Sequence, residues 1–176
     1  MKRLFAVIES PVTRVFLVGL FALSLQTTIF NTLRPFGVVL QVMLLFAVCS
    51  GVAGGSENGA LAGFAFGFMY DLILTTPLGL SGVVFGFAGY MAGWANVFVH
   101  EPKWWFKIAT VMISTATAVV LFPAACLVVG IDGLLDSRVV TLAVACAVFN
   151  GILALPVTRL MKWALVKPVR QAGWAD

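Results

Sequence analysis

The chain has 176 residues, of which 61% are hydrophobic and 10% are charged, whereas soluble domains average about 25% charged residues. A water-soluble fold of this length cannot bury so much apolar surface, so the composition excludes a soluble domain. The formal net charge of +4 does not indicate nucleic-acid binding, because the basic residues gather at the ends of apolar segments and form no continuous stripe.

Six apolar segments follow one another along the chain, each near the length of about 20 residues that a spanning helix needs. The predicted spans are residues 15–30, 36–53, 60–74, 80–99, 106–129 and 139–161. A glycine-rich polar turn at residues 54–59 separates the second span from the third, and Pro77 and Gly79 mark the next turn. We therefore expect an all-α polytopic bundle of about six transmembrane helices, forming a single membrane domain over residues 1–176.

The ends of the chain are basic, and residues 162–176 form a polar, basic tail. If the N-terminus is cytoplasmic, nine of the eleven lysines and arginines lie inside, and two, Arg34 and Arg138, lie outside. This bias predicts that both termini are cytoplasmic. The first apolar segment is not followed by a small-residue cleavage site, so we expect it to be retained as a helix.

The sequence offers no recognisable catalytic or metal-binding arrangement. Cys49, Cys126 and Cys146 lie far apart in apolar runs without CxxC spacing, and we interpret them as small apolar residues. His100 is the only histidine, so a metal site lacks further ligands. No nucleophile and base stand at a recognisable spacing, and no phosphate-binding loop is present. We expect no enzymatic activity, no catalytic residues, no metal and no cofactor.

Glycines recur at every fourth position in and before the third span, and a second set occupies the fourth span. The first set is Gly51, Gly55, Gly59, Gly63 and Gly67, and the second is Gly82, Gly86, Gly89 and Gly93. Small residues at this spacing let another helix approach closely. Two interpretations remain open: packing within the chain, or docking of a partner's single-span helix on a face that includes Gly63 or Gly86.

The next step of four after Gly67 is Asp71, an acidic residue in an apolar stretch. A buried ionisable group in a membrane is a functional candidate, because its desolvation is costly unless it is paired. Asp71 can instead point to the interface, or accept hydrogen bonds from the amides of Thr75 or Thr76 in the following turn. Gln26 in the first span and Asn150 in the sixth are candidates for hydrogen bonds between helices. Pro156 is expected to bend the sixth span.

The stretch from Gly63 to Leu72, GFAFGFMYDL, and the turn from Thr76 to Leu80, TPLGL, resemble a known family. They are similar to the G-x-x-x-G-x-x-x-D-L segment and the following proline, leucine and glycine turn of MreD, the rod shape-determining protein family of bacteria. Further similarity lies at Arg34-Pro35, Tyr90, Asn150-Gly151 and Pro156. The length, the number of predicted spans and the basic ends also fit this family.

The resemblance implies a non-enzymatic scaffold of the cell-elongation machinery in the bacterial cytoplasmic membrane. The implied partners are MreC, and, directly or indirectly, the actin-like MreB, the glycosyltransferase RodA, a class B penicillin-binding protein and membrane lipid. The motif residues that this implicates are Gly63, Gly67, Asp71, Pro77, Gly79, Gly86, Asn150 and Pro156. An alternative is the substrate-binding membrane subunit of an energy-coupling-factor type vitamin transporter, which has a similar size and number of spans.

Overall fold

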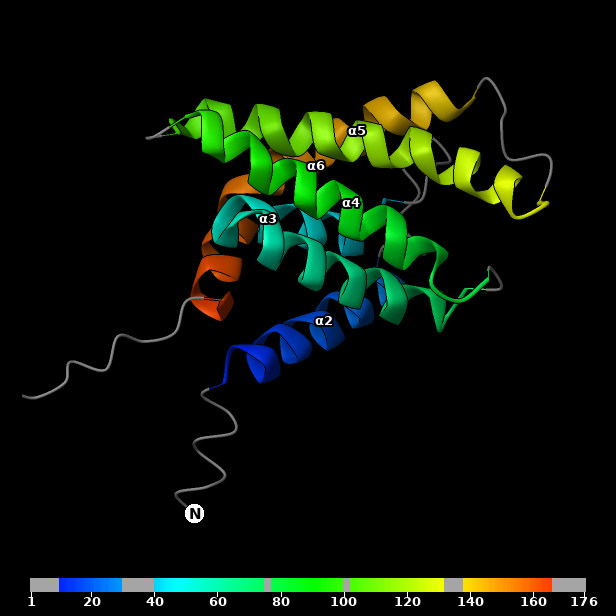
Figure 1. The fold of residues 1–176 in the computed structure, drawn as a ribbon, viewed down its shortest axis with the longest axis horizontal. Helices are drawn as coiled ribbons and strands as arrows, with labels where there is room; N and C mark the ends of the chain where they lie inside the picture. The colour runs from blue at the N-terminus through cyan, green and yellow to red at the C-terminus, as the bar shows by residue number, and fades with distance from the viewer. Residues whose placement is uncertain (1–9, 30–39, 75–76, 100–101, 132–137, 166–176) are drawn as a thin grey trace, which may run out of the picture.

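A computed structural model describes residues 10–29, 40–74, 77–99, 102–131 and 138–165 (Figure 1). The described chain is all helical, which confirms the predicted fold class at this level. It contains five α-helices and one 3-10 helix, with the following bounds: α2 Pro11–Thr28, α3 Val42–Asp71, α4 Leu80–Ala95, η2 Asn96–Phe98, α5 Trp104–Val128 and α6 Arg138–Leu165.

Helix α2 begins four residues before the predicted first span, because residues outside the apolar run form a good helix start. Ser10 is the N-cap, and its hydroxyl oxygen accepts a hydrogen bond from the Thr13 amide at 3.2 Å. Pro11 occupies the first turn, where a missing amide donor costs nothing. The helix ends at Thr28, two residues before the predicted end of the span.

Helix α3 is a hairpin of two helical arms, residues 42–54 and 56–71, which meet at Gly55. Gly55 has φ 85° and ψ 177°, a backbone conformation that is accessible almost only to glycine. A Cβ built on Gly59 would lie 2.5 Å from the Cα of Gly51, although eight residues of a straight helix span about 12 Å. The rings of Phe46 and Phe66 also meet edge to face, with centroids 6.3 Å apart. The two arms therefore run antiparallel, as two predicted spans joined by a turn would.

The turn itself is much shorter than the predicted polar turn at residues 54–59. The helix resumes at Ser56, so Glu57 and Asn58 are helical, and only Gly55 leaves the helical conformation. The Asn58 side chain donates a hydrogen bond to the carbonyl oxygen of Gly54 at 2.9 Å, which bridges the break. The prediction of a six-residue turn was wrong because one glycine in this conformation is enough to reverse the chain.

The remaining helices follow the predicted spans closely, with differences at their ends. The fourth span becomes α4 followed by the short η2, whereas α5 and α6 begin two and one residues before the predicted starts. Helix α6 continues to Leu165, so the first four residues of the predicted tail are helical. Pro123 and Pro156 both lie inside continuous helices. The three cysteines are buried, and none of them forms a disulfide.

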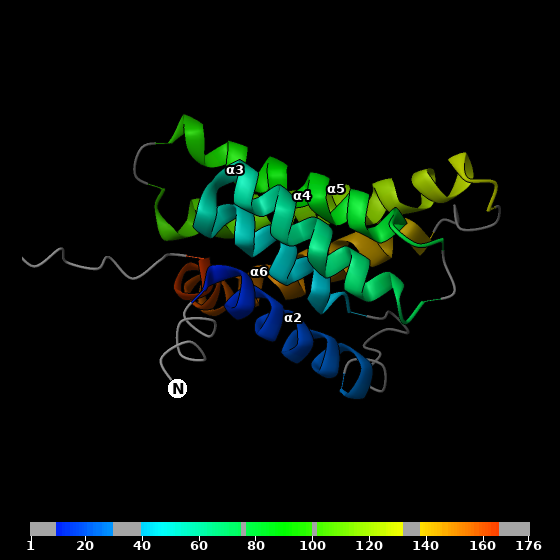
Figure 2. The same ribbon diagram turned by 60° about the horizontal axis from the view of Figure 1, so that its bottom comes forward.

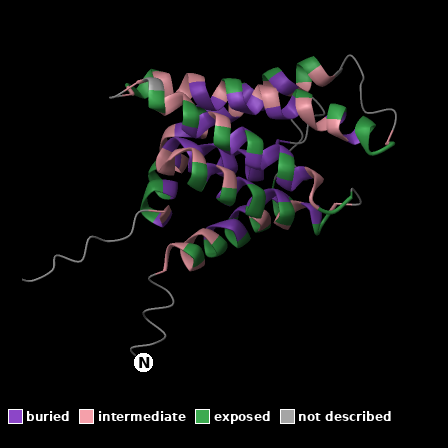
Figure 3. Cartoon of the chain, viewed as in Figure 1, coloured by how far each residue is buried: buried purple, intermediate pink, exposed green. Residues whose placement is uncertain are grey.

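The helices pack with their buried residues facing one another and their exposed residues on the outer faces (Figures 1, 2 and 3). Helix α2 begins and α6 ends at the same end of the bundle, where the tip of the α3 hairpin also lies (Figures 1 and 2). Here the guanidinium of Arg14 lies 5.1 Å from the centre of the Trp163 ring. The two ends of the described chain are thus on one side.

Three helices in the described part are long and apolar enough to cross a membrane: Pro11–Thr28, Trp104–Val128 and Val139–Leu165. Helix α4 is apolar but shorter. The arms of α3 have about 13 and 16 residues, or roughly 20 and 24 Å of helix. The described residues therefore form three helices that are long and apolar enough to cross a membrane, with the two arms of α3 and the shorter α4 between the first and the second of them.

Candidate functional site

The carboxylate of Asp71, at the end of α3, caps the start of α4. Its Oδ2 accepts a hydrogen bond from the Gly79 amide at 2.8 Å and another from the Ser81 amide at 3.0 Å, and its Oδ1 lies 3.3 Å from the Ser81 nitrogen. Asp71 is only 1% exposed. The first amides of a helix have no partner within the helix, so a carboxylate at this place satisfies them and interacts favourably with the helix dipole.

The local sequence explains why this cap comes from another helix. The N-cap position of α4 is Gly79, which has no side chain to accept a hydrogen bond. Its φ of 95° and ψ of −12° place it in the left-handed region, which favours glycine. Pro77 precedes it, and the Pro77 carbonyl accepts a hydrogen bond from the Leu80 amide at 3.3 Å. The turn thus supplies the geometry, and Asp71 supplies the acceptor.

Capping is one of the roles that the sequence predicts for Asp71, but the amides that it caps differ from the expected ones. Thr75 and Thr76, the expected donors, lie outside the described residues. The donors in the structure are the amides of Gly79 and Ser81, eight and ten positions further along the chain. The cap therefore joins two helices and does not simply close a turn.

The two glycine sets of α3 and α4 pack directly against each other. A Cβ on Gly63 would lie 2.5 Å from the Phe85 carbonyl oxygen, and one on Gly86 would lie 3.2 Å from the Ala60 carbonyl oxygen. Each step of four residues along the second arm of α3 matches a step of four backwards along α4, in the pairs Gly59 with Gly89, Gly63 with Phe85, and Gly67 with Ser81. The two helices are therefore antiparallel, and their backbones are in contact.

This contact corresponds to packing within the chain, the first of the two interpretations of the glycine pattern. The faces of Gly63 and Gly86 are covered by the neighbouring helix of the same chain, so a partner helix cannot approach their backbones there. Gly89 also contacts the first arm of α3, through the Ala47 carbonyl oxygen at 3.0 Å from a built Cβ. The glycines thus join both arms of α3 to α4 in one compact unit.

Asn150 lies in a different part of the bundle, between α6 and α5. Its Nδ2 donates a hydrogen bond to the Thr115 hydroxyl at 3.2 Å, and both side chains are fully buried. Its Oδ1 has no hydrogen-bond partner in the described chain. The expected hydrogen bond between helices is therefore present. Pro156 is exposed and follows Asn150 later in α6.

A second polar residue of the predicted spans, Gln26, joins α2 to the start of α3, as expected of a hydrogen bond between helices. The Gln26 side chain donates to the Leu40 carbonyl oxygen at 2.8 Å and accepts from the Val42 amide at 2.7 Å. The N-cap residue of α3, Gln41, makes no side-chain cap, so Gln26 supplies the acceptor for the first amide of that helix. Gln26 is buried, with 4% of its surface exposed. A buried glutamine in a predicted span was a signal for such a contact, but its partner was not evident from spacing.

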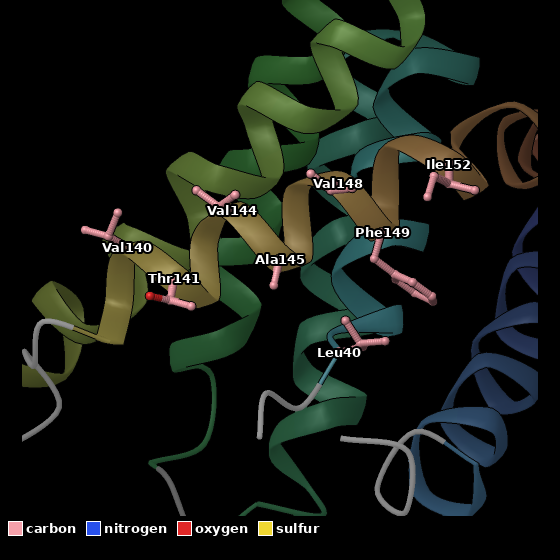
Figure 4. A pocket seen from close by; sticks show the side chains of 8 residues that line it. All are labelled: Leu40, Val140, Thr141, Val144, Ala145, Val148, Phe149 and Ile152. Atoms are coloured by element: carbon pink, nitrogen blue, oxygen red, sulfur yellow. The ribbon is translucent and has the colours of Figure 1, made fainter. Parts of the chain in front are cut away.

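Two hollows lie against the outer helices. A cavity of about 620 Å³ runs along α6, with Leu40 across from Phe149 (Figure 4). Its other lining residues are Val140, Thr141, Val144, Ala145, Val148 and Ile152. A second cavity, of about 250 Å³, lies between α2 and the second arm of α3 and is apolar apart from Asn58. Within the described residues, no three histidine, cysteine or acidic side chains group to hold a metal ion.

Comparison with known families matches residues 10–164 to the model described as rod shape-determining protein MreD. The matched region includes every described helix except the last residue of α6. Comparisons with curated proteins and with solved structures gave no match.

Proposed function

Because the chain belongs to the family of the rod shape-determining protein MreD, we propose that it is a non-enzymatic scaffold of the bacterial cell-elongation machinery and binds MreC. The family match over residues 10–164 carries this proposal. The family match supports a role in rod-shape determination. The match and the three long apolar helices together support an integral membrane protein. MreB, RodA and a class B penicillin-binding protein are its further direct or indirect partners.

The family motif serves this function as a structural element. Asp71, Gly63 and Gly67 hold α3 against α4 so closely that backbone lies on backbone. Such a unit has little freedom to rearrange, and a rigid unit presents the same surface to every partner. The motif therefore supports binding by fixing the shape of the scaffold, while the partner contacts other faces.

We expect the membrane helix of MreC to dock in the 620 Å³ cavity along α6 shown in Figure 4, which we call the α6 groove. Its wall is a ridge of β-branched residues at every fourth position, Val140, Val144, Val148 and Ile152, which are between 47% and 73% exposed. A ridge of residues four apart fits the grooves of another helix. β-branched side chains have few rotamers to lose, so docking on them costs little conformational entropy.

We place both termini in the cytoplasm and the protein in the cytoplasmic membrane, with six crossing segments. Three observations support this topology. The start of α2 and the end of α6 lie at the same end of the bundle, and the α3 hairpin provides two antiparallel arms. Arg14 lies in the first turn of α2 and Lys162 in the last turn of α6, with Arg159 three residues before Lys162. Reporter fusions at Met1 and Asp176 test it, and an extracytoplasmic signal at either end would contradict it.

Purification of the full chain in a mild detergent, followed by identification of the proteins that co-purify, tests the function. We expect to recover MreC. Recovery of an ATPase module in its place would support the vitamin transporter and overturn the scaffold. A photo-crosslinking residue at Val144 or Val148 tests the groove, with Ile113 on α5, which is 63% exposed, as the matched lipid-facing control. Crosslinks to MreC from Ile113 alone would move the docking site away from α6.

A further inference from the structure

Pro156 deprives one backbone carbonyl of α6 of its hydrogen-bond donor. The helix continues without a break through Pro156. In an α-helix each carbonyl oxygen accepts from the amide four positions later, and proline has no amide hydrogen to donate. The carbonyl oxygen of Ile152 therefore lacks the helical donor that a residue other than proline would supply at position 156.

The Ile152 carbonyl lies near the middle of a helix that is long enough to cross a membrane. Helix α6 has 28 residues, or roughly 42 Å of length, and Ile152 lies roughly 21 Å from its start. The hydrocarbon core of a bilayer is about 30 Å thick, so a crossing helix of this length extends only about 12 Å beyond it. Wherever the core falls along α6, the Ile152 carbonyl lies inside it. Water is absent there, so an unpaired backbone group costs free energy.

This carbonyl faces outward, at one end of the α6 groove. It lies between Ile152 and Pro156 on the helix surface, because a helical carbonyl points along the axis toward the residue four positions later. Ile152 is 73% exposed, and Pro156 is also exposed. The row of α6 residues that lines the groove ends at Ile152 (Figure 4). A helix docked in the groove can therefore reach this oxygen.

Neither α6 nor the lining of the groove offers a donor to the Ile152 carbonyl. Side chains that bond back to a carbonyl of their own helix lie three or four positions later, and here these are Leu155 and Pro156, which have no polar hydrogen. The amides of Leu155 and Val157 bond to other carbonyls in a regular helix. The lining is apolar apart from Thr141, which lies roughly 16 Å away along the helix. The source of the donor is therefore the molecule that occupies the groove.

We propose that the membrane helix that docks in the α6 groove carries a side-chain hydroxyl or carboxamide that donates a hydrogen bond to the Ile152 carbonyl oxygen. The inference rests on the proposed function and adds the chemistry that selects the partner helix. Backbone groups that a proline frees in a membrane helix are commonly satisfied by a neighbouring helix. Serine, threonine, asparagine and glutamine supply such donors between membrane helices.

The unpaired carbonyl favours a helix over a lipid as the occupant. The hydrocarbon tail of a lipid has no donor, and its head group lies at the bilayer surface, outside the core that contains Ile152. Next to the carbonyl, the ridge of Val140, Val144, Val148 and Ile152 offers stiff side chains at four-residue spacing, which fit the grooves of a helix. The ridge supplies packing along the partner, and the carbonyl supplies the polar point that fixes the partner's register.

A single amide hydrogen at position 156 tests the proposal. Pro156→Ala supplies this hydrogen, so α6 can close its own hydrogen bond to the Ile152 carbonyl. The matched variant has lactic acid, the hydroxy acid with the side chain of alanine, in place of Pro156, incorporated by suppression of a stop codon. It also lacks the proline ring, but its ester linkage has no hydrogen to donate. Binding of labelled full-length MreC to each labelled full-length chain is measured by energy transfer in liposomes at decreasing protein density.

Pro156→Ala should weaken MreC binding about threefold, the average effect of a hydrogen bond between membrane helices, whereas the lactic acid variant should bind like the wild type. Pro123→Ala on α5 is the control and should leave binding unchanged, because Pro123 and Val119, whose carbonyl it frees, are both buried. Equal binding by the alanine and lactic acid variants, whether strong or weak, would overturn the proposal and leave the proposed function standing. A wild-type chain that does not bind MreC would overturn both.

Discussion

Replacing Asp71 by alanine removes the acceptor for two amides that start α4. The Gly79 and Ser81 amides bond to Oδ2 at 2.8 and 3.0 Å, and the carboxylate is 1% exposed, so water cannot readily take its place. A buried donor left without a partner costs about 1 to 3 kcal/mol, and loss of a helix N-cap costs about 0.5 to 2 kcal/mol. Because removing the carboxylate also removes its desolvation cost, we expect Asp71→Ala to destabilise the protein by about 2 to 4 kcal/mol.

Asp71→Asn should be much milder, because both shorter hydrogen bonds converge on a single oxygen. The asparagine carbonyl oxygen can occupy the place of Oδ2 and accept from both amides. Its amide group would then lie near the Ser81 nitrogen, in the place of Oδ1, and the favourable interaction of a negative charge with the helix start would be lost. We expect a cost of about 0.5 to 1.5 kcal/mol.

Thermal unfolding of the purified chain in mild detergent measures both effects, alongside cell width and recovery of MreC at matched expression. With roughly 2 to 4 °C per kcal/mol for a chain of this size, the alanine variant should lose about 4 to 16 °C and the asparagine variant at most about 6 °C. Glu57→Ala, an exposed acidic residue of the same helix, is the control and should leave the midpoint unchanged. Equal damage from alanine and asparagine would refute capping and indicate a charge pair, whereas no damage from alanine would remove Asp71 from the site.

Three further predictions follow from the backbone contacts, each measured by the same unfolding midpoint. Gly67→Ala should lower the midpoint strongly, because a Cβ there overlaps the Ser81 carbonyl oxygen. Gly86→Ala should lower it less, because the nearest atom to its Cβ, the Ala60 carbonyl oxygen, lies at 3.2 Å. Equal effects would mean that the two helices separate easily. Gly79→Ala and Gly55→Ala should each cost about 1 to 3 kcal/mol through backbone strain alone, because a Cβ at either position meets nothing within 4 Å. Asparagine should restore stability at Gly79 and not at Gly55, whose ψ of 177° lies outside the left-handed helical region, and rescue at both would contradict this. Gln26→Leu should cost about 1 to 3 kcal/mol by leaving the Val42 amide without its acceptor, and a wild-type midpoint would show that this amide finds another partner.

The sequence by itself determined the class of protein and the order of its helices. Composition excludes a soluble fold whatever the packing, because the apolar surface is too large, and the polar turns locate the helices to within a few residues. The four-residue spacing from Gly51 to Asp71 also marked the part of the chain where backbones approach closely. These features are local or compositional, so they do not depend on knowing which helices are neighbours.

Tertiary structure decided which surfaces those features serve. Both glycine patterns permit close approach, but spacing does not say whether the approaching helix comes from the same chain, and only the antiparallel pairing of α3 with α4 shows that it does. Asp71 and Gln26 find their donors eight to sixteen positions away, through contacts that depend on how two helices meet. The hairpin at Gly55 follows from the same packing. Such long-range contacts are selected by the fit of whole helices, which no single segment encodes.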